Sequence, residues 1–334
     1  MTVDLTLACT NYDWTRPLWN GEVSPEGIDL HCVDYHNPER FARMIQYGEF
    51  DACEMSLGSY LASRASPGPS PCTAIPVFPY RKFRHAFIYR RAEDDVTLDE
   101  LDGKAVGLIH WQTTTAIWQR GIAAEHYGVD LESVTWHTVK PESDIVPVAI
   151  PDRFDVVQDH RDGGTTAAFT EMLTSGAIDV AFSTSPLGTR VFEGRHDETE
   201  QAAAGTDDVE RIFEDSVAVE KEYYRETGIF PPMHTVVLSD DILDAYPWVA
   251  NKLYEAFERA LARCMDRLTK PRWFPLAWAN QHLEHQQAVL GENPWAYGLD
   301  ENRTALETLQ RYASEQGVIP EPSPLEDLFV ESTI

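Results

Sequence analysis

The sequence predicts an α/β protein of two lobes, with two mixed sheets flanked by helices, a ligand cleft between them and a helical C-terminal segment. The main observation is a repeated unit. Five residues recur at a constant spacing of 128 positions: Phe41, Met44, Gly48, Asp51 and Ser56 match Phe169, Met172, Gly176, Asp179 and Thr184. Each copy predicts a helix, a glycine that ends it, a strand, and a hydroxyl residue after the strand. This order of helix, glycine and strand is also common by chance in α/β proteins.

The first lobe contains the first copy of this unit. Its predicted elements are strands at Val3 to Ala8 and Ile28 to Val33, a helix at 38–47, a short buried strand at 50–53 and a helix at 57–63. The apolar residues of the first helix lie on one face, and Gly48 ends that helix. Ser56 is placed to cap the second helix.

The rest of the chain predicts a second lobe and a return to the first. The predicted elements are a strand at 104–109, a helix at 116–127, a strand at 235–238 and helices at 246–268, 275–290 and 304–315. We therefore expect residues 1–90 and 222–334 to form lobe 1 and residues 91–221 to form lobe 2. Residues 138–166 and 196–208 are expected to be surface excursions without a chemical role.

The composition limits the range of partners. The net charge of −28 disfavours nucleic acids and anionic membranes, and it is typical of a surface adapted to high salt. The five cysteines are scattered, which argues against a disulfide framework or a structural zinc site. No signal peptide and no run of about 20 apolar residues is visible, so we expect a cytoplasmic protein.

A cationic stretch stands out in this acidic chain. Residues 75–89 include Arg81, Lys82, Arg84 and His85 between apolar runs, which predicts an anionic ligand. If residues 83–87 are extended, Arg84 and His85 point to opposite faces and only one lines the cleft, with Arg84 the preferred one. Three threonines at 113–115 precede a helix, where hydroxyls and backbone N–H groups favour anions, although capping alone would explain them.

The order of several segments resembles the 4,5-dihydroxyphthalate decarboxylase family, which is similar in fold to type II periplasmic solute-binding proteins. The segments are Asn11-Tyr-Asp13 with Thr15-Arg16, Pro25-Glu-Gly-Ile28, Phe50-Asp51 with Glu54-Met-Ser-Leu57, 75–85, Trp118-Gln-Arg-Gly121, 223–234, Asn293 to Leu299, Asn302-Arg303 and Leu306 to Leu309. They cover both ends and the middle of the chain. The resemblance implies decarboxylation of a hydroxylated aromatic acid without a cofactor. No tight ligand spacing such as His-Glu-x-x-His is present, so we expect no metal.

That chemistry assigns roles to particular residues. The candidates for proton transfer are His85, His234 and Glu54, and Glu54 could instead orient a histidine. The candidates for holding the small aromatic carboxylate are Arg81, Arg84 and Arg120, with Ser56, Gln112, Thr114, Thr115 and Thr184 as further binding residues. A structural role is the alternative for each histidine, for Glu54 and for each arginine.

Departures from the family's pattern concern the substrate. Gly58 and Ala86 stand where serines are expected, residues 113–115 replace Met-Thr-Ala, and no arginine precedes Pro186. The substrate could therefore be a monocarboxylated phenol. Two other functions stay open: a non-catalytic solute-binding protein, and a pyrimidine-synthase-like enzyme, whose clustered cysteines this chain lacks. The sequence leaves the oligomeric state open, with a homo-oligomer as one option.

Overall fold

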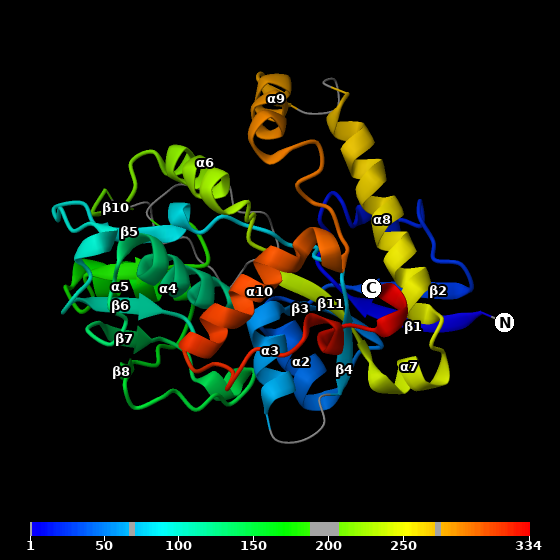
Figure 1. Ribbon diagram of the computed structural model, residues 1–334, viewed down its shortest axis with the longest axis horizontal. Coiled ribbons are helices and arrows are strands. Elements are labelled where there is room, and N and C mark those ends of the chain that lie inside the picture. The colour runs from blue at the N-terminus through cyan, green and yellow to red at the C-terminus, as the bar shows by residue number, and fades with distance from the viewer. Residues whose placement is uncertain (1, 67–70, 188–206, 271–274) are drawn as a thin grey trace.

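Two mixed sheets form the framework of the protein (Figure 1). The computed structural model describes residues 2–66, 71–187, 207–270 and 275–334. The first sheet has the order β2 (Ile28–Val33), β1 (Val3–Ala8), β3 (Ala52–Ser56), β11 (His234–Ser239), β4 (Cys72–Ile75). The second has the order β10 (Val209–Arg211), β5 (Ile88–Arg91), β9 (Val180–Phe182), β6 (Ala105–Leu108), β7 (Thr135–Thr138), β8 (Asp155–Gln158).

Helices flank both sheets, as the sequence predicts (Figure 1). They are α1 (Arg16–Trp19), α2 (Glu39–Tyr47), α3 (Leu57–Ala65), α4 (Thr114–Tyr127), α5 (Thr165–Thr174), α6 (Ser216–Thr227), α7 (Asp240–Ala245), α8 (Val249–Leu268), α9 (Ala279–Leu290) and α10 (Leu299–Glu315). The last three confirm the helical C-terminal segment. No helix within the described residues is long and apolar enough to cross a membrane.

The structure confirms the repeated unit. Strands β3 and β9 each lie third or fourth in their sheets, between a parallel and an antiparallel neighbour. Gly48 and Gly176 each follow a helix with a left-handed φ, of 59° and 75°. Asp51 and Asp179 each accept a hydrogen bond from a backbone N–H of the next parallel strand, at 2.8 and 2.9 Å. The helix expected after Thr184 would fall on residues outside the described part of the chain.

Strand β11 returns the chain to the first sheet. Strand β11 runs antiparallel to β3 in the first sheet although it follows all strands of the second sheet in the chain. Helix α10 then packs against α4, so the C-terminal segment touches both lobes. The lobe boundaries at residues 90 and 221 remain a prediction, and the first of them falls inside β5.

The condition under which Arg84 and His85 would point to opposite faces of a strand is not met, because residues 85–87 form a short 3₁₀ helix. One local expectation was wrong. Residues 138–166 are more than an excursion, because they contribute β8 to the second sheet and then enter α5. Most of the predicted insertion at 196–208 lies outside the described residues.

Candidate active site

A cavity of about 700 Å³ lies where the carboxyl ends of the parallel strands of both sheets meet. The residues that follow these strands line it: Thr10 after β1, Asp34 after β2, His110 after β6, Lys140 after β7 and Thr184 after β9, with Ser56 at the end of β3. The first residues of α4 and α5 also line the cavity. Helix N-termini therefore surround a single space, which favours an anionic ligand.

A buried dyad reaches this cavity through its histidine: His234 lines the cavity, whereas the predicted Glu54 does not. Glu54 of β3 is fully buried, and its Oε1 lies 2.6 Å from Nδ1 of His234, the first residue of β11. The pair meets because β11 runs antiparallel beside β3, with His234 opposite Ser56. The Tyr12 hydroxyl donates to the same Oε1 at 2.8 Å. The other oxygen, Oε2, pairs with the buried guanidinium of Arg40 at 2.9 Å.

The protonation of this dyad follows from its surroundings. Burial alone would raise the pKa of Glu54, but the Arg40 guanidinium and the His234 hydrogen bond lower it to about 2. Burial lowers the pKa of His234, and Glu54 only partly offsets this effect. Because a carboxylate can only accept hydrogen bonds, Nδ1 of the neutral imidazole carries the proton. Nε2 then keeps its lone pair, and His234 lines the cavity as a base.

Arg84 is the buried cation of the cavity. Its side chain donates to the Thr184 carbonyl at 3.2 Å and to the Met233 sulfur at 3.0 Å. Arg84 is 2% exposed, and no ion pair is recorded for it within the described residues. The carboxylate of Glu220 acts on Arg84 only at a distance beyond an ion pair, and a buried guanidinium without a close carboxylate is costly, so this position favours an anionic group of a ligand.

The structure brings four other predicted binding residues to the cavity: Ser56, Thr114, Thr115 and Thr184. Ser56 also caps α3, as predicted. The Thr114 hydroxyl bonds Ser56 Oγ at 2.9 Å and accepts from the Gly58 N–H at 2.8 Å, so it joins the two lobes instead of capping its own helix. A Cβ at position 58 would collide with the Gln112 carbonyl, which explains the glycine.

His85 does not line the cavity. It is 1% exposed and packs against Phe213 and Tyr223, neither of which lines the cavity. Burial, with the nearby His126, lowers the pKa of His85 to about 4. Only Arg84 of this adjacent pair faces the cavity, and the cause is the 3₁₀ turn that begins at His85.

Arg81, Arg120 and Gln112 are also outside the cavity, because each holds backbone or amide groups. Arg81 donates to the Phe230 and Ala296 carbonyls at 3.2 and 2.9 Å, and also to the Asn302 amide oxygen. The other two side chains anchor separate segments. Arg120 stacks on Trp111 and bonds Gln316 Oε1, while Gln112 donates to two carbonyls of the 142–146 segment.

Sequence reasoning missed five residues of the site: Tyr12, Arg40, Tyr80, His110 and Lys140. Two of them had a signal. Arg40 lies beside Phe41 on the apolar face of α2, and a cation there predicts a buried partner. His110 comes directly after a predicted strand, at the edge where ligands bind.

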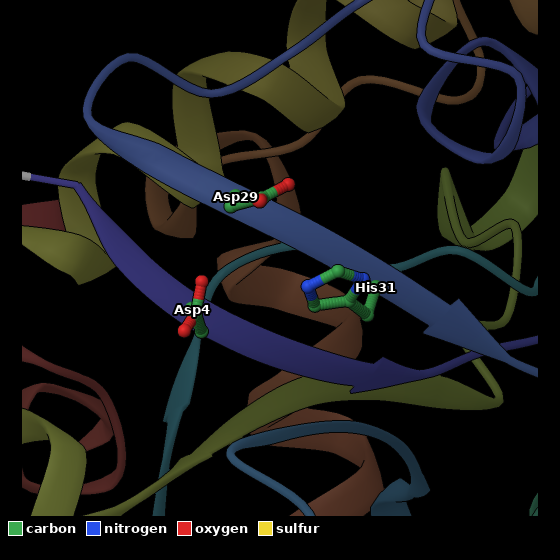
Figure 2. A group of neighbouring side chains, drawn as sticks. All are labelled: Asp4, Asp29 and His31. Atoms are coloured by element: carbon green, nitrogen blue, oxygen red, sulfur yellow. The ribbon is translucent and has the colours of Figure 1, made fainter.

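One group within the described residues could offer ligands to a metal, and it lies away from the cavity. Asp4 and Asp29 are register partners on β1 and β2, and His31 is two residues further along β2 (Figure 2). All three side chains are exposed, and none lines the cavity. Exposed carboxylates are abundant in this acidic chain, so we assign the group no role.

Two curated relatives resemble the chain. A 4,5-dihydroxyphthalate decarboxylase of Comamonas testosteroni is 30% identical over 307 residues, which cover 90% of this chain and 88% of that protein. A 4,5-dihydroxyphthalate decarboxylase of Pseudomonas putida is 38% identical over 135 residues, which cover 40% of this chain and 52% of that protein. No family model matches the sequence.

Solved structures confirm the fold. A periplasmic sulfonate-binding protein of Methylobacillus flagellatus is 14% identical with a TM-score of 0.56, over 99% of this chain and 93% of that one. The aliphatic sulphonate-binding protein of Escherichia coli is 10% identical with a TM-score of 0.55, over 98% and 92%. The desulfurization enzyme DSZB is 13% identical with a TM-score of 0.50, over 99% and 98%. The protein therefore has the fold of periplasmic binding proteins.

Proposed function

The chain belongs to the 4,5-dihydroxyphthalate decarboxylase family, and we propose on this basis that it removes carbon dioxide from a hydroxylated aromatic carboxylic acid without a cofactor. The substrate we propose is 4,5-dihydroxyphthalate or a close analogue, and the product is then 3,4-dihydroxybenzoate or its analogue. The observation that carries the proposal is that one cavity is lined both by a buried cation without an ion pair among the described residues, Arg84, and by His234, which the buried Glu54 holds from behind.

Each of these groups has a role in the proposed reaction. Arg84 holds the carboxylate that leaves and thereby fixes the ring. His234 Nε2 accepts the proton of the ring hydroxyl para to that carboxylate. Glu54 stabilises the imidazolium that forms, because its carboxylate already accepts the Nδ1 proton at 2.6 Å.

The electron pairs and protons of the reaction balance without an oxidant or reductant. The electron pair of the deprotonated oxygen moves into the ring, and the ring carbon that carries the carboxylate takes up a proton. The bond between ring and carboxylate then breaks, its electrons restore the aromatic system, and carbon dioxide leaves. The imidazolium of His234 returns its proton to the ring oxygen, so the net reaction consumes one proton for each carbon dioxide released.

The direct test is turnover in the presence of a chelator. Purified protein is incubated with 4,5-dihydroxyphthalate and with mono- and dihydroxybenzoates, and carbon dioxide release is followed. We expect release from at least one of these acids, and the best substrate decides between a dicarboxylate and a monocarboxylate. Ligand-induced melting shifts without any turnover would contradict the proposal and favour a solute-binding protein.

The role of Arg84 is tested by Arg84→Lys. Lysine keeps the positive charge but loses the two-pronged geometry that matches a carboxylate. We expect KM to rise by roughly 10-fold or more, as for the loss of one charge-assisted hydrogen bond. An unchanged KM would remove Arg84 from the binding site.

The net charge of −28 supports a further part of the proposal, that the protein works in a salt-rich cytoplasm. Added salt screens the repulsion among excess carboxylates. The melting temperature is therefore expected to rise between low and molar potassium chloride, and a fall over this range would contradict salt adaptation.

A further inference from the structure

His110 lies at a position in the second sheet that matches a cavity position in the first. It follows the end of β6 by two residues, just as Thr10 follows the end of β1 by two residues. Both residues line the cavity. Its backbone is held in place, because the His110 carbonyl accepts a hydrogen bond from the Thr113 hydroxyl at 3.0 Å.

The imidazole of His110 is buried without hydrogen bonds. The residue is 1% exposed, and within the described residues neither ring nitrogen has a hydrogen-bond partner. Its recorded acidic neighbour is Asp144, whose Oδ2 lies 3.9 Å from Nε2, beyond hydrogen-bonding distance. Buried polar groups in folded proteins are nearly always satisfied, so an unsatisfied ring that lines a cavity points to a ligand.

The charge state of His110 defines what it can offer. Burial, followed by the charges of Lys140 and His160, lowers the pKa of His110 to about 3. The ring is therefore neutral near pH 7 and presents one N–H donor and one lone pair. Such a group matches an oxygen substituent, either as a donor to it or as an acceptor from its hydroxyl.

We propose that His110 hydrogen-bonds an oxygen substituent of the substrate ring from the second sheet, while His234 acts from the first. The proposal rests on the proposed function, since it takes the ligand to be an aromatic acid. His110 would then contact the substrate directly, and a bound substrate would bridge the two lobes. The substituent is either a hydroxyl or a second carboxylate, and the experiment below separates these two cases.

The first test compares His110→Phe with the wild type. Phenylalanine fills similar space without nitrogens, so the unfolding free energy of the free protein should not fall. We expect kcat/KM for 4,5-dihydroxyphthalate to drop by roughly 10- to 100-fold, the effect of one lost hydrogen bond with an unpaired partner. His110→Asn keeps a donor and an acceptor and should recover part of the loss.

A matched control is His137→Phe. His137 lies on β7 outside the cavity, and its Nδ1 lies 3.9 Å from Asp159 Oδ2, the same distance as between His110 Nε2 and Asp144 Oδ2. This variant should keep the wild-type kcat/KM. Equal kinetics in the wild type and His110→Phe would overturn the proposal, and so would a loss in His110→Phe that only parallels a loss of folded protein.

Binding of two analogues separates the two kinds of substituent. If His110 contacts a hydroxyl, phthalate should bind the wild type and His110→Phe equally, whereas 3,4-dihydroxybenzoate should lose affinity. If it contacts the second carboxylate, the reverse pattern is expected. These titrations also separate the two proposals: absence of wild-type turnover refutes the proposed function, while equal affinities of both analogues for both proteins refute the role of His110.

Discussion

The two copies of the repeated unit share a backbone but not their charges. In the first copy, residues 39–56 run from α2 through Gly48 to β3, and in the second, residues 165–184 run from α5 through Gly176 to β9. The apolar positions, the glycine and the aspartate match. The position equivalent to Glu54 is Phe182, and the position equivalent to Arg40 is Ala168.

This difference shows which part of the unit is framework and which part is chemistry. The aspartates do the same work in both copies, because each ties its loop to the neighbouring parallel strand. The buried ion pair of Glu54 and Arg40 exists only in the first copy. The first sheet therefore carries the histidine–carboxylate dyad, while the second sheet has no equivalent dyad and places Lys140, Asp144, His110 and hydroxyl groups on its side of the cavity.

The largest effect is expected from Glu54→Gln. Removal of the carboxylate leaves the buried Arg40 with only the longer pair to Asp34, at 3.7 Å, among its recorded ion pairs within the described residues, so we expect a loss of about 3 kcal/mol in unfolding free energy. It also removes the group that orients His234, and turnover should fall at least about 10²-fold. Urea unfolding and carbon dioxide release measure the two effects.

The control is Phe182→Leu at the equivalent position of the second copy. It changes only apolar packing, so we expect a cost of about 1 kcal/mol and retained turnover. If both variants lose the same unfolding free energy, the contrast between the copies is wrong.

The charge of Glu54 also predicts a dependence of stability on pH. Its pKa is about 2 in the folded protein and about 4.3 when unfolded. A lowered pKa stabilises the fold above the unfolded value, and this stabilisation, about 3 kcal/mol, is lost as pH falls from about 5 to about 2. Between these pH values, Glu54→Gln should lose less stability than the wild type, while Phe182→Leu should run parallel to the wild type. Parallel curves for all three would contradict the prediction.

His234→Gln should lower kcat by about 10²- to 10⁴-fold with a small change in KM, because it removes the proposed base and leaves Arg84 in place. The neutral imidazole is the active form, and its pKa is below the ordinary 6.5. Wild-type kcat/KM should therefore fall on the acid side of pH 6.5, and the variant should lack this acid limb. Persistence of the same limb in the variant would exclude His234 as its source.

The aspartates should behave alike if the framework is shared. Asp51→Ala and Asp179→Ala each remove an acceptor for a backbone N–H, and each should cost about 1 to 2 kcal/mol. Asp179 also pairs with the half-buried Arg91 at 3.3 Å, which adds little. If the unfolding free energies of the two variants, measured in urea, differ by more than about 2 kcal/mol, the two aspartate hydrogen bonds do not contribute equally.

The hydroxyl positions should give the smallest effects. Ser56 caps α3 and bonds Thr114, so Ser56→Ala should cost about 1 kcal/mol. At the equivalent Thr184, only the backbone carbonyl has a recorded bond within the described residues, and Thr184→Val should stay within about 0.5 kcal/mol. Thermal unfolding of the two variants measures both losses of stability. A larger loss for Thr184→Val than for Ser56→Ala would contradict the prediction.

The contrast between the copies also explains what the sequence could predict. The fold could be predicted because its signals are local in sequence. These signals are the glycines that end helices, the apolar patterns of the strands and the repeated unit. The sequence named Glu54 and His234 and allowed Glu54 to orient a histidine, but it could not say which histidine, since these two residues meet only through the pairing of β3 with β11, 180 residues apart. The 138–166 segment was misjudged because β8 is a mostly exposed edge strand with no apolar alternation.

The close contact at Gly58 has a consequence for how homologous chains can change. No side chain fits at position 58 while the Gln112 carbonyl and the Thr114 N–H occupy their present places. A serine or larger residue there requires a shift of residues 112–114, and those residues open the helix that borders the cavity. Position 58 and positions 112–114 should therefore covary among homologues. A homologue with a larger residue at position 58 should also have a changed 112–114 segment and a wider spacing between the lobes.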